Sequence, residues 1–300
     1  MTSITTRSRR RAGAPRLAGL GFLAPFAIVF ALVFLAPIAY ALFLSLFADR
    51  LVGGVQFVGL ENFARILGDG RFWSGVGNVV LFLLVQVPIM LFLSLLVALA
   101  IDSGRVHGAA FVRLSVFLPY AVPAVVATLM WGFMYGDRFG LVRWMNELLG
   151  TSVASPLAPD TVLAAIGNIV TWQFVGYNML IFFAALRTVP ASLYEAAEID
   201  GAGELRVITA IKLPAIRGAL VIATIFSIIG SFQLFNEPSI LRNLAPNAIT
   251  SYFTPNIWAY ELSFSGQQQG LAAAVAILMG ILTAVIAYLV QLRGMRKEQR

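Results

Sequence analysis

The amino-acid sequence predicts an all-α integral membrane protein with six transmembrane helices. Of its 300 residues, 59% are hydrophobic and 12% are charged, and the mean hydropathy is +0.86, which lies outside the range of soluble domains. Six windows contain no charged residue, and each is long enough to span a bilayer as a helix: 17–48, 72–101, 114–136, 161–186, 218–236 and 262–292. The alternative is a soluble protein with six buried core helices, which this composition disfavours.

The helices are expected where these windows lie. We predict them at 18–47, 77–101, 113–135, 162–186, 217–236 and 266–291, within a single domain of residues 1–300. Prolines inside the first and third helices are tolerated where neighbouring helices or waters satisfy the freed carbonyl groups; they are Pro25, Pro37, Pro119 and Pro123. Residues 60–67 carry apolar side chains at helical spacing, which predicts a short interfacial helix.

The N-terminal region determines the predicted topology. Its basic start and apolar run are similar to a signal peptide, but a signal h-region has about 7–15 residues, whereas this run reaches Phe47. We therefore expect an uncleaved first helix. With the N-terminus inside, fifteen Lys and Arg residues lie in inside segments and six in outside segments, which favours both termini in the cytoplasm. The net charge of +7 then lies beside anionic lipid headgroups and requires no nucleic-acid partner.

The segment 187–216 is polar and lies between two apolar windows. Pro190 can start a helix, Gly201 and Gly203 permit a sharp turn at positive φ, and a second short helix fits Glu204–Ile211 before Pro214 ends it. The segment is therefore expected to form a helix–turn–helix.

Charge indicates what this loop binds. Its basic and acidic residues are equal in number: Arg187, Arg206, Lys212 and Arg217 against Glu195, Glu198, Asp200 and Glu204. A loop that binds lipid is expected to be polybasic, so the balanced charge favours a protein partner. The alternative is a solvated loop whose acidic residues pair with its own basic residues, and the residues alone leave both interpretations open.

A resemblance to a known family favours the protein partner. Glu195-Ala196-Ala197 is followed by Gly201 at six residues from the Glu, and then by Ile211-Lys212-Leu213-Pro214. This pattern resembles the EAA loop, the cytoplasmic docking element of ABC-importer permease subunits. Further segments resemble the maltose-type, sugar-importing subset of that family: Phe117–Pro123 with Trp131, Tyr177–Ile181 and Ser231–Pro238. Departures at Val207, Ile208 and Gln267–Gln269 leave the subfamily open.

The resemblance implies a permease subunit of an ATP-driven sugar importer in the bacterial inner membrane, forming half of the translocation pathway. It implies three kinds of partner: a second permease subunit, a dimer of ATP-binding cassette ATPases, and an extracytoplasmic sugar-binding protein. It also implies that the loop residues that couple to the ATPase are Glu195, Ala196, Ala197, Asp200, Gly201, Ile211, Leu213 and Pro214.

No catalytic or cofactor chemistry is expected in this chain. A Walker A loop requires Gly-x-x-x-x-Gly-Lys followed by Ser or Thr, but Lys212 precedes Leu213 and Lys297 precedes Glu298. ATP and magnesium are therefore expected on the partner ATPase. The absence of cysteine excludes disulfides and thiolate metal sites, and no metal site is expected.

Polar side chains inside the membrane helices are the candidates for the substrate pathway. A neutral, hydroxyl-rich solute requires amide groups and aromatic faces, and the fifth helix supplies both in Ser231, Phe232, Gln233, Phe235 and Asn236. The matching helix of maltose-type permeases lines the sugar site. Polar residues of the fourth helix are weaker candidates: Asn168, Thr171, Gln173 and Asn178. The alternative role for all of them is hydrogen bonding between helices.

Two other functions fit the sequence less well. An ion-coupled secondary transporter usually places Asp, Glu or His inside the membrane, and the six windows contain none. A passive channel leaves the 187–216 loop unexplained.

Overall fold

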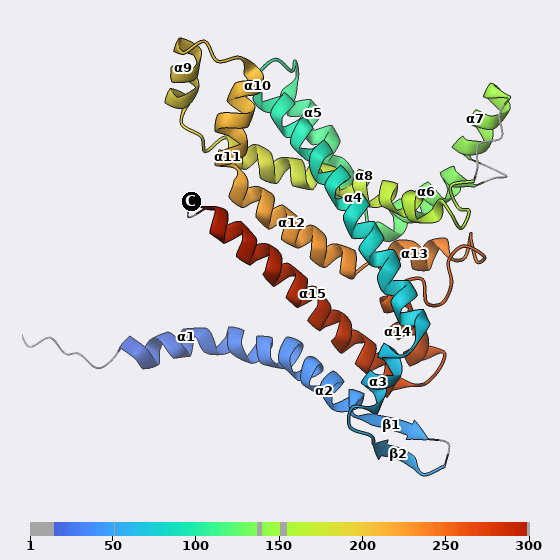
Figure 1. Ribbon diagram of the computed structural model, residues 1–300. Coiled ribbons are helices and arrows are strands. Elements are labelled where there is room, and N and C mark those ends of the chain that lie inside the picture. The colour runs from blue at the N-terminus through green and yellow to red at the C-terminus, as the bar shows by residue number, and fades with distance from the viewer. Residues whose placement is uncertain (1–14, 51, 137–139, 151–154, 299–300) are drawn as a thin grey trace, which may run out of the picture.

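The computed structural model describes residues 15–50, 52–136, 140–150 and 155–298, and this part of the chain is mostly helical (Figure 1). Five helical segments are long and apolar enough to cross a membrane: Phe22–Ser45, Gly70–Asp102, Val162–Leu186, Arg217–Leu241 and Gln269–Gly294. A bent pair of helices between residues 109 and 135 provides a sixth. The predicted fold class is confirmed.

The N-terminal half of the first span lies apart from the other helices. The span consists of α1 (Pro15–Phe30), a π-helical turn (Ala31–Leu35) and α2 (Ala36–Ser45), and its apolar window has no buried residue. Figure 1 shows α1 extending away from the other helices, with α2 approaching α15 (Gln269–Glu298). Exposed side chains here include Phe26, Phe30 and Phe34, which form a stacked series along the helix.

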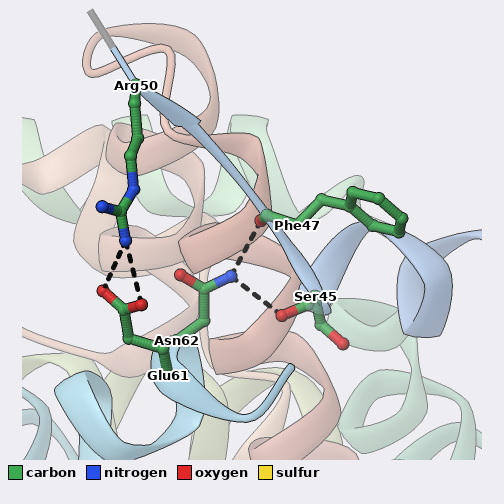
Figure 2. A network of polar contacts seen from close by, with 5 residues as sticks. All are labelled: Ser45, Phe47, Arg50, Glu61 and Asn62. Carbon is green, nitrogen blue, oxygen red and sulfur yellow. Dashed lines mark hydrogen bonds and ion pairs between the residues drawn. The ribbon is translucent and has the colours of Figure 1, made fainter. Parts of the chain in front are cut away.

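A hairpin that the sequence analysis did not predict follows the first span. Strands β1 (Phe47–Arg50) and β2 (Gly54–Phe57) pair antiparallel, and α3 (Glu61–Leu67) matches the predicted interfacial helix. Figure 2 shows how they are joined: Asn62 Nδ2 donates hydrogen bonds to the carbonyl oxygens of Ser45 and Phe47, both at 2.8 Å, and Arg50 pairs with Glu61 at 3.0 Å. Asn62 is buried, so it fixes the hairpin against α3.

Helices α4 (Gly70–Asp102) and α8 (Val162–Leu186) form the most extensive helix pair of the structure. Asp69 caps α4, because its side chain accepts a hydrogen bond from the backbone N–H of Arg71 at 2.9 Å. Helix α8 has the predicted bounds. Gly176 lets it lie directly against α5, because a Cβ at this position would overlap the carbonyl of Val116.

The third span differs from the single helix expected at 113–135. Helix α5 (Ala109–Phe117) is followed by a 3₁₀ turn (Leu118–Ala121) and then by α6 (Ala124–Tyr135), with a bend of 97° between them. Pro123 explains the break, because proline has no N–H to donate and disfavours the α region for the preceding residue; Leu118, which precedes Pro119, stays in the α region. Val122, which precedes Pro123, is extended, with φ −77° and ψ 126°.

The fifth span is also interrupted, contrary to the helix expected at 217–236. Helix α12 (Arg217–Phe232) ends four residues early, and α13 (Asn236–Leu241) follows after a short non-helical segment. Pro238 lies in the first turn of α13, where a proline is well tolerated. Beyond α13, α14 (Pro255–Phe264) packs on α15. The short helix α7 (Leu141–Leu149) lies between the third and fourth predicted spans.

Candidate functional site

A cavity of about 420 Å³ lies where the two interrupted spans meet α4 and α8. Irregular backbone at membrane depth is tolerated only where protein buries it or where it lines a water-filled cavity, and both breaks border this cavity. Its lining residues are Phe82, Gln86, Met90, Tyr120, Ala124, Val170, Phe174, Tyr177, Asn178, Phe226, Ser227, Ile229, Gly230, Ser231, Gln233, Leu234, Asn236 and Glu237.

Three of the five predicted pathway residues line the cavity: Ser231, Gln233 and Asn236. The structure does not bring Phe232 and Phe235 to it. Phe232 is 3% exposed and packs in a core cluster with Trp258, and Phe235 lines a second cavity with its ring 5.5 Å from that of Tyr260. Because α12 ends at Phe232, the residues after it no longer follow the helical spacing on which the prediction relied.

The aromatic faces of the cavity come from other helices. Tyr120 of the 3₁₀ turn stacks on Tyr177 of α8 with ring centroids 4.8 Å apart, and it meets Phe174 edge-on at 5.6 Å. In the sequence, the segments of Tyr120 and Tyr177 were informative only through their resemblance to maltose-type permeases. The two residues are far apart in the chain, so no local pattern predicts that their rings stack.

Two amide side chains of the cavity wall donate to the protein through their nitrogens. Gln86 Nε2 donates to Thr171 Oγ1 at 3.3 Å, and Asn178 Nδ2 donates to the carbonyl oxygen of Phe174 at 3.0 Å. Their amide oxygens therefore stay available as acceptors. Gln233 and Asn236 are exposed, so their amides can both donate and accept.

Other polar residues of the spans hold helices together, as the alternative interpretation proposed. Asn168 donates to the hydroxyl of Tyr135 at 2.7 Å, and Gln173 donates to the carbonyl of Val122 at 3.3 Å. Neither lines the cavity. Of the weaker candidates on the fourth helix, only Asn178 lies in the cavity wall.

Glu237, which was not among the predicted pathway residues, is buried in the cavity wall with 8% exposure. The charge-free window ends at residue 236, but the apolar span continues to Leu241. An acidic residue therefore lies within a span, although none was expected there. The signal that could have found it is the apolar residues that follow Pro238.

The segment 187–216 forms the expected helix–turn–helix. Helix α9 (Ala191–Ile199) begins after Pro190, and α10 (Glu204–Val207) continues through a π-helical turn (Ile208–Lys212) into α11 (Leu213–Ala215). Gly201 has φ +70°, but Gly203 does not have the positive φ that was expected, since its φ is −67°. Pro214 lies inside α11 and does not end the helix, which continues to Ala215.

Ion pairs connect this loop to the α4–α5 connection at the same end of the molecule (Figure 1). Lys212 Nζ lies 2.6 Å from Asp102 Oδ2, with the side chains only 10% and 9% exposed, and Arg105 pairs with Glu204. Among the described residues, no ion pair joins two residues of the loop. The interpretation that the loop's acidic residues pair with its own basic residues is therefore wrong.

Tyr194 of α9 packs against Lys212, the basic member of the buried ion pair. Lys212 Nζ lies 5.5 Å from the centroid of its ring, and its hydroxyl is buried with no hydrogen-bond partner. Burial raises the pKa of Tyr194 above its ordinary value and nearby Asp102 adds to the rise, whereas Arg187 lowers it. The phenol is therefore neutral at physiological pH and packs against the ammonium group of Lys212 through its ring.

The opposite side of the loop faces outward. Glu195, Ala196, Asp200 and Gly201 are exposed, while Ala197, Ile211, Leu213 and Pro214 are half-buried. Two apolar side chains that the sequence analysis did not select are strongly exposed, Ile199 at 86% and Leu205 at 76%. The surface thus combines acidic and apolar groups on a short, connected scaffold.

The chain is similar to known membrane transport proteins. The family of the binding-protein-dependent transport system inner membrane component matches residues 63–297. The sulfoquinovosyl glycerol transport system permease protein SmoG of Agrobacterium fabrum is 31% identical, covering 90% of this chain and 88% of the relative. The diacetylchitobiose uptake system permease protein NgcF of Streptomyces coelicolor is 32% identical, covering 90% and 80%.

A further relative and a solved structure are also components of transport systems. The trehalose/maltose transport system permease protein MalF of Thermococcus litoralis is 30% identical over 91% of this chain and 94% of the relative. The fold matches a chain in the crystal structure of a bacterial ABC transporter involved in the import of the acidic polysaccharide alginate, with a TM-score of 0.81 and 19% identity, covering 93% of this chain and 96% of that chain.

The chain therefore belongs to the family of binding-protein-dependent transport system inner membrane components. It is a multi-pass permease subunit of an ABC importer, and the alternative of an ion-coupled transporter is set aside.

Proposed function

We propose that this permease imports a sugar and forms half of a translocation pathway that passes through the cavity between α4, α8, α12 and α13. The observation that carries the proposal is the meeting of two interrupted spans at one cavity whose largely apolar wall contains several polar side chains. Its wall combines amides, hydroxyls and the stacked pair of Tyr120 and Tyr177, which are groups that recognise a sugar through its hydroxyls and its ring faces. The sugars in the names of the relatives support the same class of substrate.

Within this pathway, Ser231, Gln233 and Asn236 contact the sugar. Phe232 and Phe235 support the wall from outside the cavity, because they pack against Trp258 and Tyr260 respectively.

The energy comes from a partner ATPase that holds ATP and magnesium and docks on the 187–216 loop. The proposed coupling residues are those of the EAA pattern: Glu195, Ala196, Ala197, Asp200, Gly201, Ile211, Leu213 and Pro214. The exposed acids and the apolar side chains of Ile199 and Leu205 supply the contact surface. The complete importer contains a second permease subunit, an ATPase dimer and an extracytoplasmic sugar-binding protein, and both termini of this chain lie in the cytoplasm of a bacterium.

Reconstitution tests this proposal. The chain is co-expressed with its partner permease, ATPase and binding protein, purified through a tag on this chain, and placed in proteoliposomes with ATP inside. Uptake of radiolabelled lactose, trehalose and diacetylchitobiose is then measured, with an ATPase variant that lacks its Walker A lysine as the control. We expect uptake of at least one of these sugars only with the active ATPase. Co-purification without an ATPase, or uptake that an ion gradient alone drives, would contradict the proposal.

A further inference from the structure

We infer that Glu237 makes the cavity selective for uncharged saccharides over acidic ones. The inference rests on the proposed function, because it takes the cavity as the path of the sugar, and it adds the charge class of the substrate.

The position of Glu237 is unusual for an acidic residue. Its side chain is 8% exposed and belongs to the cavity wall, next to Asn236 at the break between α12 and α13. It takes part in none of the ion pairs found among the described residues. Arg242, the residue directly after α13, pairs with Glu261 at 2.6 Å. A buried acid without a cationic partner is costly, which indicates that Glu237 has a role in the cavity.

Glu237 suits a ligand that is rich in hydroxyl groups. A carboxyl group offers two oxygens as acceptors, and the amide oxygens of Gln86 and Asn178 add two more, because their nitrogens already donate to the protein. Sugar hydroxyl groups are donors that can fill these acceptors. A protonated carboxyl group keeps an acceptor oxygen and gains a hydroxyl donor, so Glu237 can bond sugar hydroxyl groups in either protonation state.

The same wall disfavours an acidic sugar. No Lys, Arg or His occurs among the described residues that line the cavity. A carboxylate or sulfonate brought into it would lose water without gaining a cation, and it would lie near a second acidic group, which is unfavourable for both. An uncharged sugar avoids both penalties.

Cysteine labelling measures this selectivity in the permease itself, apart from the binding protein. The chain contains no cysteine, so Ala124→Cys places a single thiol in the cavity wall. The assembled importer in nanodiscs is treated with methyl methanethiosulfonate, and mass spectrometry follows the labelling of this chain. The protecting sugars are lactose, trehalose and diacetylchitobiose as uncharged probes, and sulfoquinovosyl glycerol and an alginate trisaccharide as acidic probes.

We expect at least one uncharged sugar to slow labelling, and the acidic sugars to require at least about tenfold higher concentrations for the same protection. Adding Glu237→Gln, which keeps the shape but removes the carboxyl group, raises the half-protecting concentration of the uncharged sugar about fivefold. It also narrows the difference in protection between the two classes of sugar. Glu147→Gln is the matched control, because it removes the same charge from the exposed helix α7 and leaves protection unchanged.

The outcomes separate the inference from the proposed function. If no sugar of either class protects the thiol in an importer whose ATPase is active, the cavity is not the sugar path and the proposed function fails. If acidic sugars protect as well as uncharged ones, or if Glu237→Gln leaves both classes unchanged, the selectivity inference is overturned while the sugar path stands. Should Glu237→Gln prevent assembly, equal protection by the two sugar classes on the chain with Glu237 intact still overturns the inference.

Discussion

Lys212 in the 187–216 loop forms a buried ion pair with Asp102, the last residue of α4, with Nζ 2.6 Å from Oδ2. The sequence places these residues 110 positions apart, and only the fold brings them together. The pair connects the loop proposed to receive the ATPase to a helix that lines the cavity. The ion pair is therefore a direct contact between the loop and α4.

The first prediction concerns this ion pair. Lys212→Met leaves Asp102 buried and unpaired, which costs about 3–5 kcal/mol, so we expect a lower unfolding temperature and weaker retention of the ATPase. Adding Asp102→Leu removes the unpaired charge and recovers most of the stability. Thermal unfolding in detergent and pull-down of the ATPase measure both effects.

The exposed pair of Arg105 and Glu204 is the control for this experiment. Glu204→Gln is expected to change stability little, because exposed pairs contribute about 0–1 kcal/mol. Equal effects for Lys212→Met and Glu204→Gln would show that burial of the Lys212 pair has no structural consequence.

The second prediction concerns the turn of the loop. Gly201 has φ +70° with open space around it, so Gly201→Asp strains the backbone and does not create a clash. We expect lost ATPase attachment or lost coupling, measured by pull-down and by ATP hydrolysis stimulated by the binding protein. Gly203→Asp adds the same charge where φ is −67°, and we expect a much smaller effect. Normal attachment, hydrolysis and transport in Gly201→Asp would refute the docking role of the loop.

The third prediction concerns the cavity amides. Gln233→Ala and Asn236→Ala each remove an exposed amide from the cavity wall, and we expect reduced sugar uptake with normal assembly. A lost hydrogen bond of about 1 kcal/mol corresponds to a several-fold weaker interaction. Asn243→Ala, outside this cavity and exposed, is the control. Unchanged uptake in both test variants would place the sugar contacts elsewhere.

The fourth prediction concerns topology. The excess of Lys and Arg in the inside segments predicts that both termini lie in the cytoplasm. A cytoplasmic reporter fused after Arg300 should be active, and the same reporter inserted within 137–160 should not. An external C-terminus would place the 187–216 loop out of reach of an ATPase and would overturn the docking proposal.

The fifth prediction concerns pH. Hydrogen bonding to the side chain of Arg71 lowers the pKa of Asp69 below its ordinary value, although partial burial opposes the shift. Because the folded pKa is the lower one, the charged cap stabilises the protein above about pH 4 and loses this contribution as the pH falls through the folded pKa.

Asp69→Asn tests this prediction, because asparagine still caps a helix but carries no charge. We expect its thermal stability to fall below that of the native chain near pH 7, and the difference to shrink toward pH 3. Asp69→Ala, which also loses the cap, should be about 1 kcal/mol less stable than Asp69→Asn at every pH. A difference between Asp69→Asn and the native chain that is constant with pH would contradict the role of the charge.

The sequence by itself determined where the chain is apolar enough to span a membrane and where the loop turns. Helix α8 has the predicted bounds, because an uninterrupted apolar window between charged ends leaves a helix as the structure that satisfies its backbone in lipid. The turn at Gly201 followed equally from local chemistry, since only glycine adopts a positive φ without strain. Both features depend on residues that are neighbours in the chain.

Only the tertiary structure decided how the interrupted spans meet. Pro119 and Pro123 were visible, but the 97° bend depends on what packs against the freed carbonyl groups. The end of α12 at Phe232 directed Phe232 and Phe235 away from the cavity, whereas Tyr120, Tyr177 and Glu237 came to line it. Contacts such as Lys212 with Asp102 join residues far apart in the chain, and no local pattern contains the packing that brings them together.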